Sequence, residues 1–153
     1  MHGHGLALAA GALLRSPRVP LGGEVPQLGC PLAEELLRPA RDYAPALARL
    51  RRAVPVLAES PIGADGLAGD ALRGWPRGLG VRLVRGTWPV LPVFRLIRTL
   101  GRLSDAGLAR RFNLGLGLLV VVAPPAVDEA LKTLLDAGER AHVIGRVTRT
   151  GRV

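Results

Sequence analysis

The chain has 153 residues, enough for one domain with a buried core, and its content of 48% hydrophobic and 22% charged residues excludes wholesale disorder. The net charge is +9, and every basic residue except Lys132 is an arginine. A positive field suits nucleic acid, an acidic membrane or a phosphorylated small molecule. The arginines are scattered along the sequence, however, and aromatic residues make up only 3%. We therefore expect no nucleic-acid partner, and we attribute the arginines to a coding bias that replaces lysine on solvated faces.

The apolar runs of the sequence predict neither a signal peptide nor a membrane-spanning helix. Its cysteine and histidines predict neither a disulfide nor a metal site. The run Leu6–Leu14 resembles a signal-peptide core, but no charged segment precedes it and no small-residue cleavage site follows it. The longest apolar run, Leu116–Pro125, is too short to span a bilayer. Cys30 alone excludes an internal disulfide and fits a reducing, cytoplasmic compartment as a buried or incidental thiol. His2 and His4 have no carboxylate near them in sequence, so we expect no metal.

The spacing of apolar residues and the positions of proline and glycine predict helices alternating with strands in a single domain over residues 1–153. We expect helices over 5–15, 31–37, 43–52, 67–73, 93–100, 105–110 (capped by Ser104) and 126–137, strands over 54–58, 81–85, 116–123 and 141–148, a loop over 16–30 and a turn over 59–66. The strand over 116–123 is apolar on both faces, which predicts a central position in its sheet. The fold class is α/β or α+β, with a mixed sheet of about four or more strands covered by helices.

Five passages carry a pattern of residues that can be compared with known families. They are Met1-His-Gly-His-Gly, Leu36-Leu-Arg-Pro-Ala-Arg-Asp-Tyr, Thr87-Trp-Pro-Val-Leu-Pro-Val-Phe-Arg-Leu-Ile, Arg111-Phe-Asn-Leu-Gly-Leu-Gly-Leu-Leu-Val-Val and Ala141-His-Val-Ile-Gly-Arg-Val. In this order they resemble the segments LHSNG, LLxPTRIY, WPxPPIFxLI, FNMGIGMxxVV and AxxIGxV of the C-terminal domain of the aminoimidazole-ribonucleotide synthetase (phosphoribosylformylglycinamidine cyclo-ligase) family. The resemblance covers nearly the whole chain, and its Phe-Asn-x-Gly-x-Gly passage is specific.

The resemblance implies an activity and a missing half. The family is a two-domain, ATP-dependent ligase of purine biosynthesis: ATP activates the formyl oxygen of formylglycinamidine ribonucleotide, and an amine nitrogen then attacks to close the ring. Its N-terminal domain supplies most of the nucleotide site. We therefore expect no cofactor in this chain alone, ATP and magnesium only with an N-terminal ATP-binding domain, and no activity without that partner. We also expect a homodimer or a complex with an ATP-binding domain.

The family's glycine-rich HITGGGL loop suits a phosphate cradle made of backbone N–H groups. Its ungapped counterpart here is Pro61-Ile-Gly-Ala-Asp-Gly-Leu. A proline removes a donor and Asp65 repels a phosphate, so we predict that this loop has lost the family's substrate role. The stretch Asp65–Asp70 also resembles the SDGLxxDL loop of thiamine-monophosphate kinase, from the same superfamily, although a turn followed by a helix explains it equally well.

We expect the candidate site to suit a phosphorylated ribonucleotide, and we assign no catalytic residue to it. Its members are His2, Arg41, Gly63, Asp65, Gly66, Asn113, Gly115 and Gly117. Asn113, Gly115 and Gly117 would shape the cleft between the two domains, or the two glycines simply allow close packing against the central strand. Arg41 is otherwise a solvated residue, His2 part of a disordered chain start, and Asp65 and Asp70 are turn and helix-start residues. Two functions remain open, namely half of a cyclo-ligase and a degenerate, non-catalytic paralogue that serves as a binding or dimerisation module.

Overall fold

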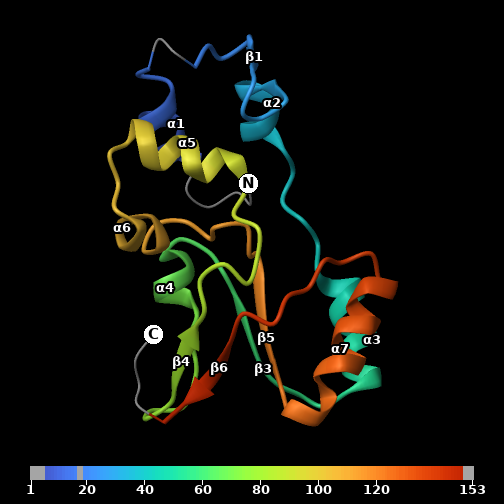
Figure 1. Ribbon diagram of the computed structural model, residues 1–153. Coiled ribbons are helices and arrows are strands. Elements are labelled where there is room, and N and C mark those ends of the chain that lie inside the picture. Colours follow the sequence, from blue (N-terminus) through green and yellow to red (C-terminus); the bar gives the residue numbers. More distant parts are fainter. Residues whose placement is uncertain (1–5, 17–18, 150–153) are drawn as a thin grey trace. The chain divides into compact units, whose positions relative to one another are not determined.

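Residues 6–16 and 19–149 are described by the computed structural model of the chain (Figure 1). They form two compact units between which the chain passes repeatedly. Unit 1 holds the described residues of 1–41, 62–70 and 90–117, and unit 2 holds those of 42–61, 71–89 and 118–153. Helices and strands are interspersed along the chain, which confirms the mixed α and β class predicted from the sequence.

Unit 1 is built mainly of helices around one apolar core. Its elements are α1 (Leu6–Leu13), β1 (Glu24–Val25), β2 (Cys30–Pro31), α2 (Leu32–Leu37), α4 (Gly66–Asp70), α5 (Pro92–Leu100) and α6 (Asp105–Ala109). α5 buries Val93, Phe94 and Ile97 against α1, and the ring of Phe94 lies 5.9 Å, centroid to centroid, from that of Phe112. Ser104 caps α6, because its Oγ accepts from the Gly107 amide at 3.0 Å, as predicted.

Unit 2 combines two packed helices with two small sheets. Its elements are α3 (Ala44–Ala53), β3 (Val56–Pro61), β4 (Gly80–Leu83), β5 (Leu118–Val122), the 3-10 turn η1 (Pro124–Ala126), α7 (Val127–Asp136) and β6 (Gly145–Thr148). α3 and α7 lie side by side (Figure 1) and share a small core that includes Leu50 and Ala130. Arg49 of α3 donates to the carbonyl of Asp136 at the end of α7, where a cation is favoured.

An ion pair in unit 2 joins α3 to β3. The Arg51 guanidinium donates to both carboxylate oxygens of Glu59, at 2.9 and 2.6 Å. This side-chain hydrogen bonding, together with the Glu59 charge, raises the pKa of Arg51 above its ordinary value. Arginine is charged at any physiological pH, so the shift reports the geometry of the pair and introduces no titration.

The strands of the described residues pair as three two-stranded antiparallel sheets, β1–β2, β3–β5 and β4–β6. The prediction of a single sheet of about four strands, with strand 116–123 at its centre, is therefore wrong for the described residues. Val120 and Val122 of β5 pack with the α3–α7 core, while Leu119 is buried with 8% of its surface exposed. A helix pair on one face explains the apolar pattern that suggested a central strand.

Other differences from the prediction lie at the ends of elements. The expected loop over 16–30 contains the short β1–β2 ladder. β3 continues to Pro61, so the expected turn over 59–66 begins later. Cys30 is a buried free thiol, as predicted, and Arg38 approaches its Sγ at 3.7 Å. No helix within residues 6–16 and 19–149 has the length and hydrophobicity needed to cross a membrane.

Candidate ligand-binding loops

Two loops that the sequence singled out lie side by side in unit 1. Loop 62–66 is the counterpart of the family's glycine-rich loop, and loop 112–117 carries the Phe-Asn-Leu-Gly-Leu-Gly passage. The residues that flank them, Pro61 and Leu118, are partners in the β3–β5 register. The two loops therefore begin at adjacent strand ends, and we call them the paired loops.

Backbone hydrogen bonds join the paired loops along their length. The amide of Ile62 donates to the carbonyl of Gly117 at 3.0 Å. The amide of Leu67, just beyond the first loop, donates to the carbonyl of Phe112, also at 3.0 Å. Loop 62–66 is thus fixed to loop 112–117 near both of its ends, without any side-chain contact being needed.

Asn113 organises the second loop. The amide of Leu116 donates to the Asn113 carbonyl at 2.9 Å, and the amide of Gly115 donates to the Asn113 Oδ1 at 3.2 Å. The two central residues of this turn have positive φ, 53° at Leu114 and 95° at Gly115. That combination belongs to type I′ turns and favours glycine and asparagine over leucine. Asn113 is buried, so its side-chain oxygen shapes the turn.

Gly66 is required where the first loop crosses the end of α6. Its φ is +66°, and a Cβ placed there would lie 2.6 Å from the carbonyl oxygen of Ala109 and 2.7 Å from both Arg110 C and Arg111 N. These are backbone atoms, so no side-chain rotation could relieve the contact. Only glycine permits both the backbone angle and this close approach.

The backbone amide of Gly63, the first glycine of loop 62–66, donates a hydrogen bond to a buried carboxylate. Asp70 is 1% exposed, and its Oδ2 accepts from the Gly63 amide at 2.7 Å. The Gly66 amide donates to the Gly63 carbonyl at 3.3 Å. The amides of Ile62, Gly63, Gly66 and Leu67 are therefore all used within the protein. A phosphate cradle needs several such amides to converge on the anion.

The structure brings together most of the residues that the sequence nominated. Gly63, Asp65, Gly66, Asn113, Gly115 and Gly117 all lie in the paired loops. Arg41 is exposed on the segment between α2 and α3, outside both loops. His2 lies outside the described residues.

Asp65 and Asp70 have different environments. Asp65 is exposed and its carbonyl accepts from Gly69 in the first turn of α4, as expected of a turn residue. The interpretation of Asp70 as a helix-start residue is wrong, because Asp70 is the last residue of α4 and is buried. No local pattern in the sequence marks this role, because Asp70 differs from an ordinary helix residue only in its burial and in its hydrogen bond to Gly63.

Neither the tryptophans nor a cluster of metal-binding side chains supplies a ligand-binding group in the paired loops. Trp88 is buried, and the Trp75 indole donates to the buried Ser60 hydroxyl at 2.8 Å. Trp88 is therefore a packing residue, and Trp75 is tied to β3 by its indole hydrogen bond. Among the residues that the structure describes, no three His, Cys, Asp or Glu side chains gather where they could hold a metal ion.

Comparison with known proteins defines the class to which this fold and these loops belong. The family model for the C-terminal domain of AIR synthase related proteins matches residues 1–153. The chain therefore belongs to this family, and the resemblance inferred from the sequence motifs is confirmed.

The relatives are cyclo-ligases by name. The chain is 37% identical over 151 residues to a Streptomyces fradiae protein provisionally named phosphoribosylformylglycinamidine cyclo-ligase, covering 99% of this chain and 83% of that protein. It is 36% identical over 151 residues to the phosphoribosylformylglycinamidine cyclo-ligase of Shouchella clausii and 32% identical over 149 residues to that of Geobacillus kaustophilus. Those matches cover 98% and 97% of this chain but only 44% and 43% of the two enzymes. The chain thus spans less than half the length of these two relatives.

Proposed function

We propose that the chain is the C-terminal half of a phosphoribosylformylglycinamidine cyclo-ligase of purine biosynthesis. The observation that carries the proposal is the pairing of the Phe-Asn-Leu-Gly-Leu-Gly loop with loop 62–66, in a chain that matches the family over residues 1–153. The names of the relatives support the same reaction. The compartment that suits this pathway is the cytoplasm.

The reaction divides between two halves. The formyl oxygen of formylglycinamidine ribonucleotide takes the terminal phosphoryl group of ATP, the amine nitrogen bonds to the former formyl carbon, and the oxygen leaves with the phosphate. ATP and magnesium belong to an N-terminal half, on the same polypeptide or on a separate one. The paired loops of this chain form a rigid wall beside the ribonucleotide, positioned by Gly66, Asp70 and Asn113. The 153 residues alone are then inactive, and they act as a homodimer or in complex with the ATP-binding half.

A genetic test follows directly. A bacterial strain that lacks its own cyclo-ligase requires purine, and we expect this chain to restore growth only when it is expressed with an ATP-binding half, such as the N-terminal part of the Geobacillus kaustophilus enzyme. Each half expressed alone is the control. Growth with this chain alone would contradict the proposed division of the reaction.

The second candidate, a non-catalytic paralogue, is favoured by the chemistry of loop 62–66. The amides of Ile62, Gly63 and Gly66 donate within the protein, and the exposed Asp65 adds a negative charge to the loop that would bind the phosphate of a ligand. Two such charges about 4 Å apart repel by on the order of 1 kcal/mol in water, and by more when they are partly buried.

Restoring the family's residues distinguishes the two candidates. The variant combines Pro61→His, Gly63→Thr, Ala64→Gly and Asp65→Gly, and the ligand is ribose 5-phosphate measured by calorimetry. If the loop has lost its substrate role, the restored variant binds more tightly than the unaltered chain. Equal affinities would show that the altered loop still serves the ligand.

A further inference from the structure

The arginines that look scattered in the sequence are concentrated by the topology of unit 2. Two segments, 71–89 and 140–149, contain seven arginines and neither aspartate nor glutamate. The other 124 residues hold fourteen basic and twelve acidic side chains, so they are almost neutral. Pairing of β4 with β6 brings the two segments together. The members of this basic set are Arg73, Arg77, Arg82, Arg85, Arg140, Arg146 and Arg149.

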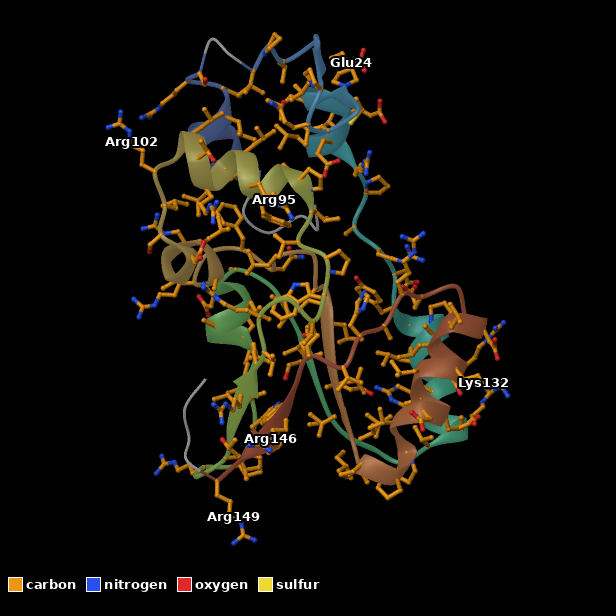
Figure 2. The ribbon with its side chains drawn as sticks, in the orientation of Figure 1. Glu24, Arg95, Arg102, Lys132, Arg146 and Arg149 are labelled. Carbon is orange, nitrogen blue, oxygen red and sulfur yellow. The ribbon has the colours of Figure 1, made fainter. Side chains whose placement is uncertain are left out.

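The register of the sheet sets two of these arginines directly opposite each other. Arg82 of β4 is the partner of Arg146 of β6, and both are exposed. The amide of Val84 donates to the carbonyl of Ile144 at 2.7 Å, which fixes the hydrogen-bonded pairs at every second position. Arg82 and Arg146 therefore form such a pair, with Cα atoms about 5.5 Å apart and both side chains on one face. Figure 2 shows Arg146 on this sheet.

Like charges in this position destabilise a sheet, and a two-stranded sheet has little stability to spare. Elsewhere the chain neutralises such arginines: Arg51 pairs with Glu59, and Arg98 pairs with Asp105. In the described part of the chain, no carboxylate forms an ion pair with Arg82 or Arg146. The charge on this face is best neutralised by an anion from outside the chain.

We propose that the face of the β4–β6 sheet around Arg82 and Arg146 binds a phosphate dianion. A guanidinium offers a planar fork of N–H donors, and two forks about 5.5 Å apart at their Cα atoms can converge on one tetrahedral anion. A nucleic-acid strand is disfavoured, because aromatic residues make up only 3% of the chain and Trp88 is buried, which leaves too few rings for a stacking platform. The phosphate is either the free ion or the phosphate group of a sugar phosphate. This site does not depend on the proposed ring-closing function.

The test is a titration of the full chain with inorganic phosphate, followed by backbone and arginine Nε–Hε signals in ¹H–¹⁵N spectra at constant ionic strength. We expect saturable shifts at the amides of β4 and β6 and at the two arginine side chains. The double variant Arg82→Gln with Arg146→Gln should bind phosphate about tenfold more weakly or worse. The matched control, Arg95→Gln with Lys132→Gln, removes the same charge from exposed positions on α5 and α7 (Figure 2) and should bind as the unaltered chain does.

Equal weakening by the two double variants would overturn the proposal, because the effect would then belong to the overall field. Shifts confined to other elements would also overturn it. If the glutamine variant loses its folded spectrum, Arg82→Lys with Arg146→Lys keeps the charges and removes the forks; this variant must bind measurably more weakly than the unaltered chain. A parallel titration with ribose 5-phosphate identifies the source: tighter binding at the same signals assigns the site to phosphate monoesters, and weaker binding assigns it to the free ion.

Discussion

Replacing Gly66 by alanine tests the packing that holds the paired loops. The new Cβ would meet backbone atoms of Ala109, Arg110 and Arg111 at 2.6–2.7 Å, and φ is +66°. The left-handed conformation costs an alanine about 1–2 kcal/mol, and forcing an atom into packed backbone adds about 1–3 kcal/mol. A total of about 3 kcal/mol lowers the melting temperature of a chain of this length by roughly 6–12 °C. Thermal unfolding followed by circular dichroism measures this loss.

The chain supplies a matched control in Gly74. Its φ is +77°, close to that of Gly66, yet a Cβ there would have no atom within 4 Å. Gly74→Ala therefore carries the conformational cost alone, about 1–2 kcal/mol, and a fall of roughly 2–8 °C. The difference between the two variants isolates the collision. If Gly66→Ala is no more destabilising than Gly74→Ala, loop 62–66 does not lie against the end of α6 as described.

Four further outcomes are expected. Asp70→Ala should cost about 1–3 kcal/mol in urea unfolding, because it leaves the part-buried Gly63 amide without its acceptor; Asp70→Asn, which keeps an oxygen acceptor, should cost less. Gly145→Ala should cost about 1–3 kcal/mol and weaken hydrogen-exchange protection in β4 and β6, since its Cβ would collide with the carbonyl of Arg82; unchanged protection would contradict the register. Calorimetry should detect no micromolar binding of ATP to the chain, whereas a micromolar constant would refute the assignment of the nucleotide to another half. Sedimentation over a wide concentration range should reveal a dimer or, with an ATP-binding half present, a complex, because exposed Leu57 and Leu135 leave apolar surface to cover; a monomer that binds no such half would contradict this.

Local patterns in the sequence were sufficient to predict where helices α5, α6 and α7 lie. The apolar spacing of α5 and α7 and the Ser104 cap each depend on residues within two turns, and these helices lie close to where they were predicted. The sheets depend on partners far apart in sequence. β4 pairs with β6 across more than sixty residues, and no local pattern fixes that register.

The candidate site, too, could be predicted from the sequence only in part. The motif Phe-Asn-Leu-Gly-Leu-Gly identified the second loop, and Gly115 occupies one of its two positions with positive φ, where glycine is the residue expected. The role of Asp70 could not be predicted, because only burial and the 2.7 Å bond to Gly63 distinguish it from an ordinary helix residue. The opposition of Arg82 and Arg146 was invisible for a related reason: charges scattered in sequence become a cluster only when the strands pair.

The central claim is that this chain completes ring closure together with an ATP-binding half. The most direct measurement is aminoimidazole ribonucleotide formed from formylglycinamidine ribonucleotide and ATP, with the chain, the ATP-binding half, and their mixture assayed separately. We predict product only in the mixture, with one ADP released for each product molecule. No product from a mixture in which sedimentation shows the two halves bound to each other would contradict the claim, and so would product from this chain alone.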